Sequence, residues 1–163
     1  MITARTAALT ALTLALAFLT AAPARADGTI FLGANLTPST RAAEGAALGI
    51  SFAVLGFEVE YCDTSSDAVN LAPSLKTGMA NALVQTPLPL LGLQPYVTAG
   101  GGVYRETLGA HQDTDFGWNI GGGLKLTLIG PLKLRADYRM FNLGRGALNS
   151  PAHRVYVGLN VGF

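Results

Sequence analysis

The chain has 163 residues, of which 50% are apolar and only 13% are charged. That length suits a single domain, and the charged fraction is well below the roughly one quarter of an average soluble protein. The formal net charge is +1 and no run of Lys and Arg occurs. The sequence therefore excludes the basic surface with which proteins bind nucleic acids.

The first segment explains part of the apolar excess. Arg5 precedes an apolar stretch that ends at Pro23, and small residues lead up to Ala26. This order is typical of a secretory signal peptide. A buried or anchoring helix is the alternative, but the stretch is short for a membrane span. We therefore expect a signal peptide over 1–26 and a single further domain over 27–163.

After residue 26, no stretch has the uninterrupted apolar length that a membrane helix needs. The sequence alternates instead with a period of two, which is typical of β-strands. In 153–163, apolar residues from Val155 to Phe163 alternate with small or polar ones such as Arg154 and Asn160. Because successive residues of a strand face opposite sides of a sheet, this strand would have one apolar face.

The same alternation predicts seven further strands. In 131–141, four successive charged residues share one face and apolar residues fill the other. Two segments, 28–37 and 73–84, leave open which of their faces is apolar. The eight predicted strands are 28–37, 44–54, 55–62, 73–84, 93–106, 116–128, 131–141 and 153–163.

The predicted connections alternate in length. Those near residues 54–56 and 129–131 are tight, whereas 86–92 is of medium length and apolar. Short turns at one end and longer polar loops at the other are typical of outer-membrane β-barrels. The long loops are expected at 37–43, 63–73, 107–114 and 142–152.

The position of the charges decides between two kinds of antiparallel sheet. A soluble sheet points its apolar face inward. A barrel in lipid must close so that every backbone group is paired, and its apolar face points outward. Four predicted strands reach the roughly 9–11 residues that a tilted membrane strand needs, which favours the barrel. A solvated sheet face in a soluble protein is the alternative.

The interior of an eight-stranded barrel has room only for side chains. The charges on the predicted inner face nearly balance, and buried charges are tolerated when they are paired and hydrogen-bonded. We therefore predict a salt-bridged lumen that plugs the barrel and leaves no open pore. The predicted lumen charges are Glu58, Glu60, Glu106, Lys125, Lys133, Arg135, Asp137, Arg139 and Arg154.

Aromatic residues on the predicted outer face suggest the girdles that mark the two interfaces of a membrane. We expect Phe57 and Phe163 near one interface. Tyr61, Phe116 and Trp118 are expected near the other.

These features resemble the small OmpA/OmpX/OmpW-type outer-membrane β-barrels of Gram-negative bacteria. The resemblance covers the whole chain after the signal peptide and implies an all-β, eight-stranded, antiparallel up-and-down transmembrane barrel. It implies outer-membrane lipids and, during biogenesis, the barrel-assembly machinery as partners, with Phe163 as the assembly signal, and a monomer. The segments that carry it are PYVTAGGGVY (95–104), FGWNIGGGLKLTL (116–128), LKLRADYRMFN (132–142) and VYVGLNVGF (155–163).

The polar residues predict little chemistry. His111 and His153 fall in or beside predicted loops without a recognised metal spacing, so we expect no metal and no cofactor. Lipid A deacylases of similar architecture use a Ser-His pair, but Val155 stands where a serine on the same strand face would follow His153. Cys62 is the only cysteine and cannot form an internal disulfide.

We therefore expect a noncatalytic outer-membrane barrel, exported through the inner membrane, that serves envelope integrity or surface interaction. A small-solute channel or a conduit for hydrophobic ligands is the first alternative. A lipid A-modifying enzyme is a weaker one, and a soluble periplasmic barrel of the lipocalin kind is another. Proteins that bind nucleic acids remain excluded.

Overall fold

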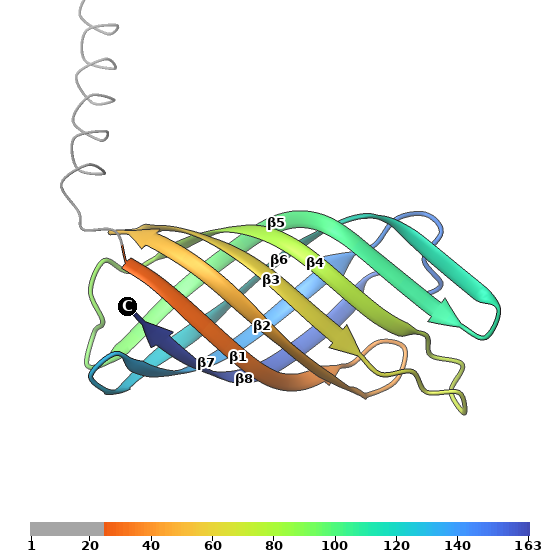
Figure 1. The fold of residues 1–163 in the computed structure, drawn as a ribbon, viewed down its shortest axis with the longest axis horizontal. Coiled ribbons are helices and arrows are strands. Elements are labelled where there is room, and N and C mark those ends of the chain that lie inside the picture. Colours follow the sequence, from red (N-terminus) through yellow and green to blue (C-terminus); the bar gives the residue numbers. More distant parts are fainter. Residues whose placement is uncertain (1–24) are drawn as a thin grey trace, which may run out of the picture.

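The computed structural model describes residues 25–163, which form one closed β-barrel. Each strand pairs antiparallel with the next, and the last pairs with the first (Figure 1). The predicted fold is confirmed. Residues 1–24 of the expected signal peptide lie outside the described residues. The strands are β1 (Arg25–Asn35), β2 (Arg41–Phe52), β3 (Leu55–Thr64), β4 (Ser74–Gln85), β5 (Leu93–Leu108), β6 (His111–Ile129), β7 (Leu132–Asn142) and β8 (Ala152–Gly162).

The alternation of side chains has the polarity expected for lipid rather than for water. On β7, Arg135 and Arg139 are fully buried inside the barrel, whereas Leu134 and Tyr138 are exposed on the outer surface. The same relation holds on β8, where apolar residues face out and Arg154 faces in. The apolar faces of these strands therefore point away from the lumen, as the sequence predicts.

The facing of the two ambiguous segments is now defined. On β1, Ile30 and Leu32 point outward. On β4 the large apolar side chains Leu75, Met79 and Leu83 are buried inside the barrel, and the outer face carries mainly small residues. Apolar residues thus lie on both faces of β4, which is why alternation alone could not orient it.

The predicted loop at 107–114 is wrong. These residues continue β5 and β6, which reach 16 and 19 residues and pair in register out to Leu108 and His111. Only Gly109 and Ala110 connect them, and Gly109 has a φ of +58°, which a glycine adopts without strain. The polar composition of 107–114 suggests a loop, but a strand segment that extends beyond the membrane can be polar on both faces. The long hairpin projects from one end of the barrel (Figure 1).

Apart from 86–92, which is of medium length as predicted, the other connections follow the expected alternation. Three loops, 36–40, 65–73 and 143–151, lie at the end where the β5–β6 hairpin projects, here called the loop end. The opposite end, here called the turn end, holds the connections 53–54, 86–92 and 130–131 together with both ends of the described chain (Figure 1). Within residues 25–163, no helix has the length and apolar character that crossing a membrane requires.

Candidate functional site

A network of buried charges fills the middle of the lumen. Arg135 donates to both carboxylate oxygens of Glu58, from Nη2 at 3.2 Å and from Nη1. Arg139 Nη2 also reaches Glu58, at 2.9 Å, and its Nε donates to Asp137 at 3.0 Å. All four side chains are at most 2% exposed. Strands β3 and β7 are thereby tied together across the barrel.

The network continues toward the loop end through Glu60. Its carboxylate pairs with Arg154 on β8 and lies 3.0 Å from Arg139 Nη1 on β7. Arg154 also stacks over the ring of Phe141, with its guanidinium carbon 4.4 Å from the ring centroid. Three guanidinium groups and three carboxylates therefore balance within one buried cluster, which we call the lumen network: Glu58, Glu60, Arg135, Asp137, Arg139 and Arg154.

Two tyrosines complete this cluster. Tyr96 on β5 accepts a hydrogen bond from Arg135 Nε at 2.7 Å and donates to Asp137. The hydroxyl of Tyr156 accepts from Arg139 Nη2 at 3.3 Å. Paired, hydrogen-bonded charges of this kind can be kept in a low-dielectric interior, where isolated ones cannot. The inward facing of both tyrosines followed from the strand alternation, but their role in the network did not.

An apolar layer closes the lumen between this network and the loop end. Tyr104, Met79 and Phe141 project from the wall, and Leu143 in the β7–β8 loop folds inward to pack against them. Leu143 is only 5% exposed. Its backbone N–H donates to Ser150 Oγ at 3.0 Å, which fixes the loop across the mouth. The barrel is therefore closed at two levels, by charges and by apolar side chains.

Glu106 lies apart from the lumen network. Its carboxylate accepts a hydrogen bond from the backbone N–H of Leu148 at 2.8 Å, so it holds the β7–β8 loop in place. It forms no ion pair within the described residues. Arg41, which the predicted start of β2 at residue 44 left out, is also buried and donates to the carbonyl oxygens of Thr37 and Pro73.

Lys125 and Lys133 lie near the turn end, away from the lumen network. Lys125 is buried and its Nζ lies 3.1 Å from Asp27. Lys133 is half-buried and its Nζ donates to Gln94 Oε1 at 3.2 Å. Of the nine predicted lumen charges, six therefore meet in the network, while these two lysines and Glu106 lie nearer the two mouths.

The predicted interface aromatics all lie on the outer surface. Phe57 and Phe163 are 55% and 79% exposed and lie near the turn end. Tyr61, Phe116 and Trp118 are 53%, 63% and 45% exposed and lie toward the loop end. Their assignment to membrane interfaces remains a prediction.

A row of charged residues crosses the outer surface near the loop end. Glu44, Asp63, Lys76 and Arg105 are direct partners on the adjacent strands β2 to β5. Lys76 Nζ and Asp63 form an exposed ion pair at 3.1 Å. From this row toward the turn end, the outward side chains of β2 to β5 are apolar or small. The row therefore marks one edge of an apolar band around the barrel.

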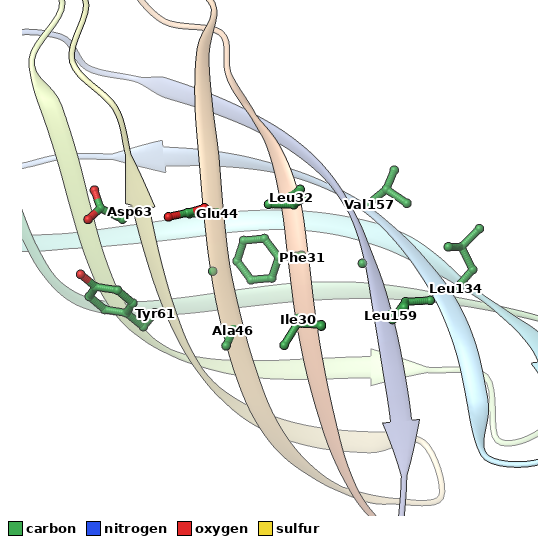
Figure 2. Close-up of a pocket in the computed structure, with 12 residues that line it drawn as sticks. Ile30, Phe31, Leu32, Glu44, Ala46, Tyr61, Asp63, Leu134, Val157 and Leu159 are labelled. Atoms are coloured by element: carbon green, nitrogen blue, oxygen red, sulfur yellow. The ribbon is translucent and has the colours of Figure 1, made fainter.

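A hollow of about 680 Å³ on the outer surface lies over β1. Leu134 and Val157 line one side of it, and Tyr61, Glu44 and Asp63 line the other (Figure 2). It opens outward from the barrel wall and does not connect to the lumen network.

The two histidines lie in different surroundings. His153 faces outward on β8 and its Nδ1 lies 2.8 Å from the hydroxyl of Tyr138, with Val155 next along the same face. His111 is exposed at the tip of the β5–β6 hairpin. In the described part of the chain, no group of three or more metal-binding side chains comes together. Cys62 is buried beside Phe31 and Tyr156.

Solved structures of other proteins resemble this barrel. The N-terminal β-barrel domain of Pseudomonas aeruginosa OprF matches with a TM-score of 0.65 and 17% identity, covering 85% of this chain and 97% of that one. Neisserial surface protein A matches with a TM-score of 0.60 and 17% identity, covering 85% and 94%. The outer-membrane enzyme PagL matches with a TM-score of 0.51 and 14% identity, covering 83% and 98%. No family model and no curated protein matches the chain.

The chain has the fold of the small eight-stranded outer-membrane β-barrels. The resemblance inferred from the sequence is thus confirmed at the level of the fold. At these identities the likeness extends to the architecture alone, and these structures include both an enzyme and a surface protein.

Proposed function

We propose that this protein is a noncatalytic barrel of the bacterial outer membrane. Its lumen is sealed, so its function depends on the outer surface and the loops. The observation that carries the proposal is the double closure of the lumen, by the lumen network and by the apolar layer around Leu143. A lumen whose middle is filled with side chains has no space for a substrate or a hydrated ion to pass through. The remaining surfaces are the apolar band and the two ends of the barrel.

The apolar band supports the outer-membrane location. Strands β1 to β8 have 10 to 19 residues, and roughly 9–11 tilted residues cross a bilayer. Closure leaves no unpaired strand edge, which lipid requires. Outer-membrane lipids are then the constant partner, and the barrel-assembly machinery is the transient one, with Phe163 as its signal. The barrel needs no second copy to close, so we propose a monomer.

Fractionation tests the location. The protein should be recovered with the outer membrane and should migrate faster on gels when unheated, because the closed barrel resists detergent. Recovery of the processed protein free in the periplasm would refute the proposal. A soluble lipocalin-like barrel would stay in solution without detergent. The outward-facing Ile30, Leu32 and Val157 argue against this alternative, because they would expose apolar surface to water.

Envelope integrity and surface interaction are the roles left to a sealed barrel. A deletion strain should then show increased sensitivity to detergents or altered adhesion, and the variant Met79→Ala should restore the wild-type phenotype because the lumen takes no part. If the phenotype followed solute uptake instead, the channel alternative would replace this proposal.

The enzyme alternative has a direct test. PagL has the same architecture, and His153 faces outward beside Tyr138 here. Because no serine follows His153 on that face, we propose that the hydrogen bond between His153 and Tyr138 is structural. Overexpression of the wild type should leave the lipid A mass spectrum unchanged. A change in lipid A that His153→Ala abolishes would show that the protein is an enzyme.

A further inference from the structure

A cavity of about 540 Å³ opens at the turn end of the barrel. Its inner wall is formed by the inward-facing side chains Lys125, Lys133, Gln94 and Asn160. The connections of the turn end form its rim. That volume lies within the range of ordinary small-molecule sites, and the lumen network separates it from the loop end. It plays no part in the sealing of the barrel described above.

Positively charged side chains outnumber negatively charged ones in this cavity. Lys125, Lys133 and Arg25 line it, and Asp27 is the only carboxylate side chain among the lining residues. Asp27 pairs with Lys125 and also accepts from Asn160 Nδ2 at 3.0 Å. Among the described residues, the ammonium group of Lys133 has only the neutral Gln94 as hydrogen-bond partner and forms no ion pair. Lys133 is therefore the lysine that a bound anion would pair with.

This excess does not depend on Arg25. Cleavage before Asp27, which the sequence predicts, would remove Arg25 and leave an α-ammonium group on Asp27 in its place. Lys125 and Lys133 remain in either case. Lys125 is 4% exposed, so the surrounding side chains hold it in place. The charge is thus built into the end of the barrel.

The rim of the cavity is apolar. Leu88, with Pro87 and Pro89 on either side, comes from the β4–β5 connection, and Pro131 and Phe163 lie opposite in the lining. Leu88 and Phe163 are 70% and 79% exposed. A ligand whose anionic head reached the lysines would therefore place its next atoms against apolar side chains. Lysine acts as a point charge toward phosphate, and a few polar groups within an apolar site are typical of small-molecule binding.

We propose that this turn-end cavity binds an organic phosphate with an apolar portion, its phosphate held by Lys125 and Lys133 and its apolar part by the Leu88–Phe163 rim. The phosphate can belong to a free periplasmic molecule or to a phospholipid of the adjacent leaflet. The inference goes beyond the proposed function, because a sealed barrel in the outer membrane does not require a ligand at this end.

Titration of the barrel, folded in a nonionic detergent, with n-hexyl phosphate tests the proposal. Backbone amide NMR signals of Gln94 and Gly130 should shift and saturate. Lys133→Met should weaken the binding about tenfold or more, because a hydrogen bond to a charged group is lost. The matched control Lys76→Met, a lysine on the outer surface near the loop end, should bind as the wild type does. Equal binding by Lys133→Met and wild type would overturn the proposal.

Two further arms separate the sources and test the apolar part. Inorganic phosphate should bind at least several-fold more weakly than n-hexyl phosphate, and equal affinities would refute the role of the rim. In nanodiscs, the same amides should shift when phosphatidylglycerol replaces phosphatidylcholine if a lipid supplies the phosphate. A free ligand is indicated if only added n-hexyl phosphate shifts them. The absence of a saturable shift in every arm would exclude the site. Since Lys133 is half-buried and paired only with Gln94, gel mobility of Lys133→Met checks that the barrel still folds.

Discussion

Arg135 on β7 and Glu58 on β3 form a two-point ion pair across the lumen, although their strands share no edge of the sheet. Three other strands separate β3 from β7 in either direction around the wall, so this contact joins opposite sides of the barrel. Both side chains are at most 2% exposed. The pair is therefore shielded from water and depends on the completeness of the network around it.

Glu58→Gln should lower the free energy of unfolding by about 3–5 kcal/mol, which is the usual cost of removing one partner from a buried ion pair. Arg135 and Arg139 would both lose a carboxylate and would stay buried. Urea titration of the protein in lipid vesicles, followed by the heat-modifiable gel shift, measures the loss.

Glu44→Gln is the matched control. Glu44 faces outward in the charged row, opposite Asp63, and its change to Gln should alter the unfolding free energy by about 0–1 kcal/mol. If the two variants unfolded at the same urea concentration, the buried network would contribute nothing special to the stability of the barrel.

Gly102→Ala should destabilise the barrel or slow its assembly. A Cβ on Gly102 would collide with the carbonyl of Gly78 and with the Cα of Met79, which is backbone that cannot move without disturbing β4. Overpacking of this kind costs about 1–3 kcal/mol. Gly78→Ala on the facing strand is the control, because its Cβ would make only an ordinary contact of 3.8 Å with Val103. Refolding yield and urea midpoint should fall for the first variant alone.

Glycines of the inner face show what the sequence could reveal. An eight-stranded lumen has room only for side chains, so small residues are needed beside long charged ones. Gly121 illustrates this need, because a Cβ there would lie 2.8 Å from Cγ of Arg139. The length of the β5–β6 hairpin did not follow, because Thr107 to Thr114 have loop-like composition. Only the glycine at 109, in a two-residue turn between alternating segments, could have indicated the continuous strands.

Packing between residues far apart in the sequence was the other feature that the sequence did not predict. The inward fold of Leu143 depends on the space left between Tyr104 and Phe141 on separate strands. A leucine in a nine-residue loop carries no periodic signal. The charged face of β7 was readable because its residues alternate locally, whereas their partners on β3 are far away in sequence and only closure of the barrel identifies them.

Asp67 should make the conformation of the β3–β4 loop dependent on acidity. Its carboxylate accepts hydrogen bonds from the side chain and backbone of Asn70, from Ser39 and from the backbone of Val69. These bonds, the Asn70 side chain first, lower the pKa of Asp67 below its ordinary range. A lowered pKa in the folded loop means that the contacts are complete above the ordinary value and are lost as the pH falls through the lowered one.

Amide exchange or NMR order parameters of residues 66–72 measure this effect. The loop should be ordered at neutral pH and should loosen in acid, while Asp67→Asn should be loose at both. The barrel strands should stay protected throughout. A loop equally ordered in Asp67→Asn at neutral pH would show that the carboxylate is not what holds it.

The lumen should conduct ions only when both of its closures are opened. Arg135→Ala removes the centre of the lumen network but leaves Tyr104, Phe141 and Leu143 packed across the lumen. Phe141→Ala opens the apolar layer but leaves the charges in place. We therefore expect the wild type and each single variant to be silent in planar bilayers, and the double variant to conduct.

Leu134→Ala combined with Phe141→Ala is the control, because Leu134 neighbours Arg135 but faces outward. It truncates as many side chains as the double variant and keeps every charge of the lumen network, and it should stay silent. A conductance step in Arg135→Ala alone would mean that the apolar layer moves aside readily. The channel alternative would then be favoured, since that result requires a mobile β7–β8 loop and leaves the lumen network as the only barrier.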